Sequence, residues 1–354
     1  VWNDNGNVAG KRPSSVTMVL TANSTTPDQI PEEYKTKEKI LTNENVNQEN
    51  TNEWKYTFSN LPKYDNYGNE ITYTVSEKAI EGNEAIFYTA QNTKIEGDMA
   101  NGYKVTNTFA IPEESKTSIS VPVTKVWQDT EKQKDKRPTE ITLVLTANSK
   151  TPDQIPEEAK TVEQKITEKI NKNPENEAEW KYTFSNLPKY DNYGNEISYA
   201  ITEKMDSKFY EQTNIEGNMQ EGYTITNTFK IPDETIEIPV TKVWNDNSNA
   251  NQKRPDNIVL TITGDTNTQE EGNEINETQT ITAKENTNPE NSNEWTYTFT
   301  GLPKYDENGD EVEYTIDEQG TNSEFYKKTS VDQETRRITN TFQVPGEEIE
   351  LEVT

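Results

Sequence analysis

A threefold internal repetition is the feature that most constrains this chain. The segment YTFSNLPKYDNYGNEI at Tyr56–Ile71 returns letter for letter at Tyr182–Ile197, and a looser copy occupies Tyr297–Val312. Each copy also ends in the tetrapeptide TNTF. Self-similarity of this kind indicates tandem copies of one structural unit. We therefore expect three domains in series.

The repetition predicts where these domains begin and end. The expected segments are repeat one at 1–112, repeat two at 113–232, repeat three at 233–345, and the start of a linker or of a further repeat's first strand at 346–354. Repeat one is expected to have a truncated first strand. The joins are short, acidic and contain proline, a composition that favours stiff spacers over flexible tethers.

Within each repeat the local pattern is typical of β-structure. Trp54, Tyr56 and Phe58 alternate with polar residues, and a polar turn containing Gly68 follows them. Short strands separated by turns over about 110 residues predict an all-β antiparallel sandwich. The TPDQIPEE segment of the first two repeats predicts one helical turn, starting at Pro27 in repeat one, inside a surface insertion.

Composition excludes several classes of function. The chain has 63 acidic and 35 basic residues, a formal charge of −28, which argues against nucleic acid and anionic membrane surfaces as partners. It has no cysteine and no histidine, so disulfides, thiol nucleophiles, imidazole bases and the usual zinc sites are excluded. No apolar run approaches the roughly 20 residues of a membrane span. We expect neither cofactor nor metal.

A lysine lies in phase with the apolar face of one strand. In IEIPVTKVW, alternation places Lys242 on the same face as Val240 and Trp244. Repeat two has the same pattern around Lys125. The equivalent lysine of repeat one would precede Val1.

Two more polar residues per repeat share this core-facing phase. The asparagine of each TNTF segment alternates in step with apolar neighbours, at Asn107, Asn227 and Asn340. A strand ending in glutamate does the same, at Glu77, Glu203 and Glu318. Burying such groups unpaired would cost several kcal/mol each.

Two interpretations of this set stay open on the pattern alone. The first is a buried Lys–Glu ion pair, with the asparagine completing the hydrogen bonds. The second is chemical. Desolvation lowers the pKa of a lysine and raises that of a glutamate, so a neutral amine can attack the asparagine carboxamide while a protonated carboxyl polarises it. The product would be a Lys–Asn amide formed once, with the protein as its own substrate.

Four sequence elements give the chain a family resemblance. These are VTKVW, the W…KRP loop, the W.YTF..LPKYD..G segment and GYTITNTF. Together they resemble the collagen-adhesin B-type (CnaB-type) domains of Gram-positive surface proteins. The resemblance implies an inverse-immunoglobulin, transthyretin-like sandwich with a spontaneous isopeptide bond. It pairs Lys125 with Asn227 beside Glu203, and Lys242 with Asn340 beside Glu318. Repeat one has Glu77 and Asn107 without a lysine.

The resemblance also implies a function and a location. The expected function is a structural stalk of a cell-wall-anchored, extracellular adhesin or pilus-like protein, with neighbouring repeats as partners and any host ligand bound elsewhere in the parent. The alternative is an adhesin module that itself binds a matrix protein or glycan, and an enzyme for external substrates is disfavoured. Repetition of surface segments favours the stalk. The stretch Tyr305–Glu311 contains oxygen ligands of the kind that bind Ca²⁺, but these ligands lack the spacing of an EF-hand loop. A solvated turn is therefore expected there.

Overall fold

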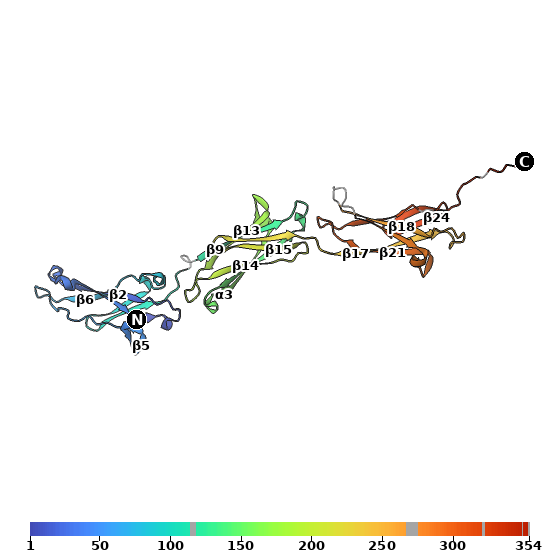
Figure 1. The fold of residues 1–354 in the computed structure, drawn as a ribbon. Coiled ribbons are helices and arrows are strands. Elements are labelled where there is room, and N and C mark those ends of the chain that lie inside the picture. The colour runs from blue at the N-terminus through green and yellow to red at the C-terminus, as the bar shows by residue number, and fades with distance from the viewer. Residues whose placement is uncertain (114–117, 267–274, 321–322, 349, 353–354) are drawn as a thin grey trace. The chain divides into compact units, whose positions relative to one another are not determined.

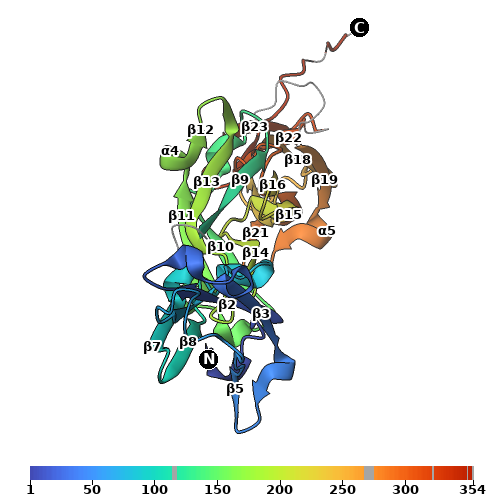
Figure 2. The same cartoon turned by 90° about the vertical axis from the view of Figure 1, so that its left-hand side faces the viewer.

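The regular secondary structure of the chain is mostly β-strand, with few helices (Figure 1). The computed structural model describes residues 1–113, 118–266, 275–320, 323–348 and 350–352. The described helices are single turns between strands, and they can also be followed in a second view of the ribbon (Figure 2). The expected all-β class of tandem sandwiches is confirmed. No helix in the described ranges is long and apolar enough to cross a membrane.

Repeat one contains two three-stranded sheets and a short hairpin, with strand orders β1-β8-β7, β3-β2-β6 and β4-β5. Its elements are β1 (Trp2–Asn3), β2 (Ser15–Asn23), α1 (Glu32–Lys35), β3 (Thr36–Thr42), β4 (Val46–Asn47), β5 (Asn50–Trp54), β6 (Thr72–Glu77), β7 (Thr93–Asp98) and β8 (Gly102–Thr108).

Repeat two has a five-stranded sheet, β12-β13-β9-β16-β15, and a three-stranded sheet, β11-β10-β14. Its elements are β9 (Ser118–Gln128), β10 (Glu140–Asn148), α3 (Glu157–Lys160), β11 (Thr161–Thr167), α4 (Glu168–Asn171), β12 (Lys172–Asn173), β13 (Asn176–Pro188), β14 (Ser198–Lys204), β15 (Tyr210–Asn218) and β16 (Gly222–Phe229).

Repeat three has the same two sheets, ordered β20-β21-β17-β24-β23 and β19-β18-β22. Its elements are β17 (Thr235–Asn245), β18 (Asn257–Asp265), β19 (Ile275–Thr282), α5 (Ala283–Asn286), β20 (Thr287–Asn288), β21 (Asn291–Pro303), β22 (Glu313–Gln319), β23 (Tyr326–Asp332) and β24 (Arg337–Phe342).

The first and last strands of repeat three are parallel neighbours in one sheet. β17 pairs with β24 in a register that sets Lys242 opposite Ile338 and Trp244 opposite Asn340. The other flank of β17 pairs antiparallel with β21, where Lys242 faces Trp295. The two ends of the fold therefore meet at the centre of the larger sheet.

Aromatic side chains supply much of the core at this meeting point. In repeat three the rings of Trp244 and Trp295 meet edge-on at 4.9 Å, and Tyr326 adds a second edge contact to Trp244 at 5.0 Å. Trp2 and Trp54 repeat the first contact in repeat one at 5.0 Å. Such edge-on pairs stabilise the fold beyond the gain from burying the apolar area of the rings. This explains how a chain with 29% hydrophobic residues builds a core.

The prediction that the TPDQIPEE segment lies in a surface insertion is wrong. A 3₁₀ turn does form at Pro27–Gln29, as the proline predicts, but it leads into α1 and then into β3, an edge strand of a sheet. Ile30 and Leu41 on this path are buried, with 3% and 6% of their surfaces exposed. The polar composition of the segment concealed Ile30 as a core position.

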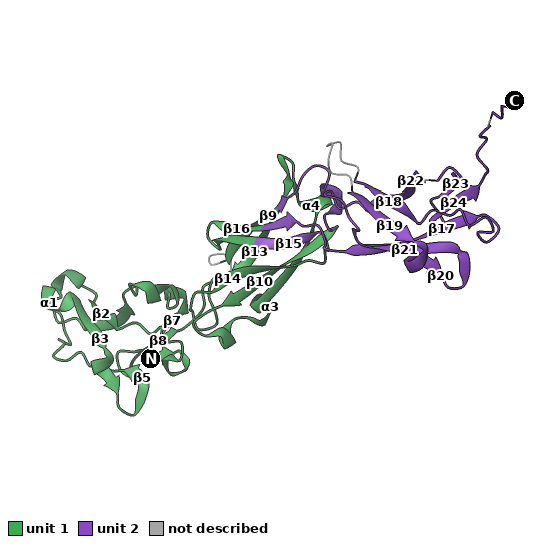
Figure 3. Ribbon diagram, turned by 45° about the vertical axis from the view of Figure 1, so that its right-hand side comes forward, with its two compact units in different colours: residues 1–126, 139–205, 214–225 green, residues 127–138, 206–213, 226–354 purple. Residues whose placement is uncertain are grey.

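The contacts within the chain divide it into two compact units (Figure 3). One comprises residues 1–126, 139–205 and 214–225, and the other comprises 127–138, 206–213 and 226–354. The loop 127–138 and the segment 206–213, both from repeat two, thus belong with repeat three.

Candidate functional site

The interior of repeat three holds a lysine and a glutamate from opposite sheets. Strand alternation turns the Lys242 side chain of β17 into the core, where none of it is exposed. Glu318 approaches from β22 of the smaller sheet, with 1% of its side chain exposed. The Nζ atom of Lys242 lies 3.1 Å from Oε2 of Glu318.

The asparagine of the last strand completes the group. Asn340 on β24 is fully buried and its Nδ2 donates a hydrogen bond of 2.8 Å to Oε1 of Glu318. One carboxyl group therefore contacts both the amine and the carboxamide. A half-turn of the amide, whose nitrogen and oxygen are nearly isosteric, brings Oδ1 to the carboxyl group instead. A protonated Glu318 could then donate to that carbonyl oxygen.

Burial changes the protonation of the lysine. Removal from water lowers the pKa of Lys242 to about 8, against the opposing attraction of Glu318. The amine also lies 4.7 Å from the ring centroid of Trp244, a cation–π contact for its charged form. The lowered pKa increases the neutral fraction of this amine relative to that of an ordinary lysine.

Repeat two buries the equivalent residues. Lys125 and Glu203 have side chains 0% and 1% exposed, with Nζ 3.8 Å from Oε2. The Nζ atom of Lys125 also donates to the carbonyl oxygens of Val126 and Ile225, at 3.0 and 3.5 Å. Asn227 is fully buried on β16, the strand next to β9 in the sheet.

Repeat one brings together the two predicted residues that it has. Asn107 donates a 2.8 Å hydrogen bond from Nδ2 to Glu77, and its Oδ1 accepts one of 2.8 Å from Thr93. Burial raises the pKa of Glu77, with the hydrogen bond from Asn107 opposing that shift. The carboxyl–carboxamide contact is thus the same as in repeat three.

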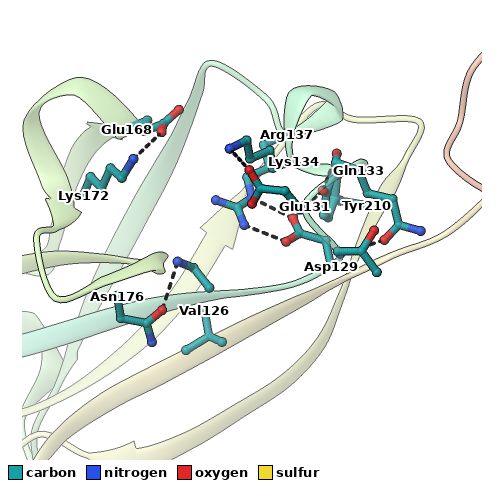
Figure 4. A network of polar contacts seen from close by, with 12 residues as sticks. Val126, Asp129, Glu131, Gln133, Lys134, Arg137, Glu168, Lys172, Asn176 and Tyr210 are labelled. Atoms are coloured by element: carbon teal, nitrogen blue, oxygen red, sulfur yellow. Dashed lines mark hydrogen bonds and ion pairs between the residues drawn. The ribbon is translucent and has the colours of Figure 1, made fainter.

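A second buried polar cluster was missed by sequence reasoning. In repeat two, Asp129 accepts two hydrogen bonds of 2.6 Å from the guanidinium of Arg137 and one of 2.6 Å from the hydroxyl of Tyr210 (Figure 4). The same trio occurs as Asp4, Arg12 and Tyr88, and as Asp246, Arg254 and Tyr326. The sequence did carry a signal for this cluster, because the aspartate and the arginine of the KRP segment recur at the same spacing in each repeat.

This cluster fixes the loop that follows the first strand. The fork of Arg254 holds Asp246 on two oxygens while the guanidinium lies 5.6 Å from the ring centroid of Trp244. Bidentate pairs of this kind are strong and geometrically specific. The loop is therefore anchored two residues beyond the tryptophan of the lysine strand, by Arg254 and by the hydroxyl of Tyr326.

The oxygen-rich turn of each repeat uses its aspartate to hold its own backbone. Asp306 accepts hydrogen bonds of 2.9 Å from the backbone N–H groups of Asn308 and Asp310. The described residues contain no cluster of three or more metal-ligating side chains. The expected solvated turn is wrong in one respect. Tyr305 and Asp306 are buried, with 6% and 5% of their surfaces exposed.

Comparison with known proteins places this geometry in a family. The family described as Cna protein B-type domain matches residues 1–108, 121–228 and 238–341. A collagen adhesin of Staphylococcus aureus is 31% identical over 265 residues, which are 75% of this chain and 18% of that protein. The chain thus spans less than a fifth of the length of this curated relative.

Solved structures of B repeats from Staphylococcus aureus are also similar to this chain. Two B repeat units of the collagen binding protein of Staphylococcus aureus are 27% identical, with 98% of this chain and 72% of that chain covered and a TM-score of 0.37. A single B repeat unit is 29% identical, with 64% and 100% covered and a TM-score of 0.24. Because the family pattern matches three successive segments, the resemblance seen in the motifs is confirmed, and the chain belongs to the Cna protein B-type domain family.

Proposed function

We propose that repeats two and three each form one intramolecular amide bond between the buried lysine and asparagine, and that the bonded repeats act as a stalk. The observation that carries the proposal is the contact of one buried carboxyl, Glu318, with both Lys242 and Asn340. A stable core has no need of this arrangement, because an apolar replacement of a buried ion pair is often neutral or stabilising.

The chemistry follows from the protonation of the pair. A proton moves from the Lys242 amine to Glu318, which leaves a neutral nucleophile and a neutral acid in a low-dielectric site. The amine attacks Cγ of Asn340 while the carboxyl donates to the carbonyl oxygen. The proton lost by the attacking nitrogen is carried to Nδ2, the C–N bond breaks and ammonia leaves. The bond that forms joins Nζ to Cγ.

Repeat two supports the same reaction for Lys125, Glu203 and Asn227, since all three side chains are withdrawn from water in the corresponding strands. Folding holds the reactants together, which supplies an effective molarity of about 10⁵ M or more. This makes a slow amide exchange feasible once per molecule. In this proposal no external substrate is turned over.

A bond between the first and last strands suits a stalk. Pulling force enters a repeat at its first strand and leaves at its last, so a direct covalent bond carries the force and the strands between are bypassed. The curated relative of this chain is a collagen adhesin. We therefore place this chain outside the cell, in the stalk of an adhesin or pilus-like protein anchored to the cell wall, with any host ligand bound by another part of the parent.

Stretching the full chain from its ends tests this function. Bonded repeats two and three should not lengthen when they unfold, whereas repeat one should. The double variant Asn227→Ala/Asn340→Ala should release two further segments of about 100 residues, each adding about 300 Å of contour length at ~3.3–3.6 Å per residue. Equal lengthening of the parent chain and the variant would exclude the stalk mechanism.

A further inference from the structure

One hydrogen bond crosses between the two sheets at the same place in every repeat. Its donor is a side chain at or directly before the start of the asparagine strand, and its acceptor is a backbone carbonyl oxygen of the glutamate strand. We call this bond the clip. The donors and acceptors are Tyr103 and Tyr73 at 2.7 Å, Tyr223 and Tyr199 at 2.6 Å, and Arg336 and Tyr314 at 2.6 Å.

The clip has a fixed spacing from the reacting groups. Its donor precedes the asparagine by four residues in every repeat, as Arg336 precedes Asn340. Its acceptor precedes the glutamate by four residues, as Tyr314 precedes Glu318. Residues four apart on a strand share a face and lie about 13 Å apart. In repeat three the clip and the hydrogen bond from Asn340 to Glu318 are therefore two equally offset contacts between the same two chain segments.

The glutamate strand needs such a contact because it lies at the edge of its sheet. β6, β14 and β22 each have a single neighbour in the smaller sheet. An edge strand carries one row of backbone groups that its own sheet leaves unpaired. A slide of this strand by one residue, ~3.3 Å, would take the carboxyl out of hydrogen-bond range of the carboxamide. The clip opposes that slide.

Repeat three keeps the clip although its donor differs. An arginine replaces the tyrosine, so the shared feature is a hydrogen-bond donor at the end of a long side chain. The same hairpin adds two more contacts. The side chain of Gln333 bonds both backbone groups of Ile316 at 2.8 Å, and Nζ of Lys328 donates to the carbonyl oxygen of Glu318 at 3.3 Å. Side chains of the β23–β24 hairpin thus follow the edge of β22 as far as the glutamate.

We propose that Tyr223 and Arg336 are positioning residues for the amide-bond reactions of repeats two and three. Each holds the glutamate strand in register with the asparagine strand, so that the carboxyl meets the carboxamide while the lysine attacks. Their hydrogen bonds lie four residues away from the reacting groups, so they act through the strands. This inference rests on the amide bonds proposed above and concerns the rate at which they form.

Timed mass measurements on the full chain test the positioning role. The chain is made by cell-free synthesis and quenched in denaturant at intervals, and digestion assigns each ammonia loss to its repeat. Because a misplacement of about 1 Å can lower such a rate about 100-fold, Tyr223→Phe should slow the loss from repeat two by about tenfold or more. Repeat three of the same molecule should keep the parent rate. Arg336→Met should slow repeat three and leave repeat two unchanged.

Tyr199→Phe is the matched control. The hydroxyl of Tyr199 donates a 2.9 Å hydrogen bond to the carbonyl oxygen of Pro188, so this variant loses a bond of the same kind from the glutamate strand of the same repeat. The clip stays in place, and the rate should equal that of the parent. Equal rates for Tyr223→Phe and the parent, or equal slowing by Tyr223→Phe and Tyr199→Phe, would overturn the positioning role alone. A parent chain that loses no ammonia would remove the amide bonds and, with them, any positioning role.

Repeat one provides a readout that requires no reaction. Its clip donor is Tyr103, and Asn107 donates from Nδ2 to Glu77 at 2.8 Å. In NMR spectra of the full chain, Tyr103→Phe should shift the carboxamide signals of Asn107 and speed the solvent exchange of its Nδ2 protons. Tyr73→Phe, which loses only a hydroxyl bond to Pro62, should do neither. Unchanged Asn107 signals in Tyr103→Phe would show that the clip does not align the two strands and would overturn the proposal.

Discussion

Lys242 and Glu318 face each other across the interior of repeat three, 3.1 Å apart between Nζ and Oε2, with neither side chain in contact with solvent. Placing two charges there would carry a desolvation penalty that their attraction only partly offsets. Transfer of the proton from the amine to the carboxyl removes both charges. The same transfer produces the nucleophile and the acid that an attack on Asn340 requires.

Removal of the carboxyl should stop the reaction without unfolding the repeat. Glu318→Ala leaves no acid to polarise the Asn340 carbonyl, so the variant should retain one more ammonia than the parent, after correction for the substitution itself. Intact mass spectrometry and circular dichroism of the full chain check both expectations.

The matched control is Glu77→Ala in repeat one. Glu77 has the same hydrogen bond to its asparagine, but no lysine of this chain is assigned to that site. Its replacement should change the mass by the substitution alone. Retention of the cross-link in Glu318→Ala would reduce the carboxyl to a structural group.

Loss of the amide bond should lower the stability of repeat three. The bond closes a loop of about 100 residues, and the chain-entropy treatment of such a closure gives about 4–5 kcal/mol at 25 °C. Asn340→Ala should therefore unfold at lower denaturant and be digested faster. Asn107→Ala removes a similar buried amide from repeat one and serves as the control, with an expected loss of about 1–3 kcal/mol for its hydrogen bonds.

The unbonded repeat should become more stable as the pH rises. In Asn340→Ala the free Lys242 has a folded pKa of about 8, below that of the unfolded chain, so the unfolded state binds more protons between about pH 8 and 10.5. The free energy of unfolding should therefore increase across this window, by about 2–3 kcal/mol between pH 7 and 10.

Urea titrations at both pH values measure this gain. Asn340→Ala/Lys242→Met is the reference, because it lacks the titrating amine while other groups remain. In the parent chain the nitrogen is an amide and the gain should be absent. An equal gain in both variants would show that Lys242 does not titrate in this range.

Repeat one should become reactive when it is given a lysine. Adding Val-Thr-Lys before Val1 extends β1 by the residues that precede the tryptophan in VTKVW. Asn107 and Glu77 are already in hydrogen-bond contact. The extended chain should lose one more ammonia than the parent and melt at a higher temperature in repeat one, whereas Val-Thr-Met should do neither. Linkage of Asn107 in the unextended chain would contradict the assignment of the donor strand.

Much of the fold was predictable because strand alternation has a period of two. That period alone places Lys242 on the side of Val240 and Trp244, and the side chain is indeed fully buried. The copied segments gave the number of repeats, and the family matches three successive stretches. These inferences need only local sequence.

Long-range placement was less accessible. Ile30 is buried although its neighbours are polar, because it packs in a core cluster with Leu20, Ile71 and Tyr73. Tyr305 was assigned to a solvated turn and is covered by Phe209, a residue of the preceding repeat. The partner of Asp129 is Tyr210, distant in sequence. No periodicity encodes such contacts, although their threefold recurrence could have signalled them.

The mass of the intact chain reports directly on the two proposed amide bonds. Each Lys–Asn amide releases one ammonia, and the set of lysine, glutamate and asparagine is complete in repeats two and three. The expected mass is lower than that of the sequence by two ammonia molecules. Digestion should yield two cross-linked peptides, one joining Lys125 to Asn227 and the other joining Lys242 to Asn340. A mass equal to that of the unmodified sequence would contradict the proposed bonds and leave a buried ion pair in each of these repeats.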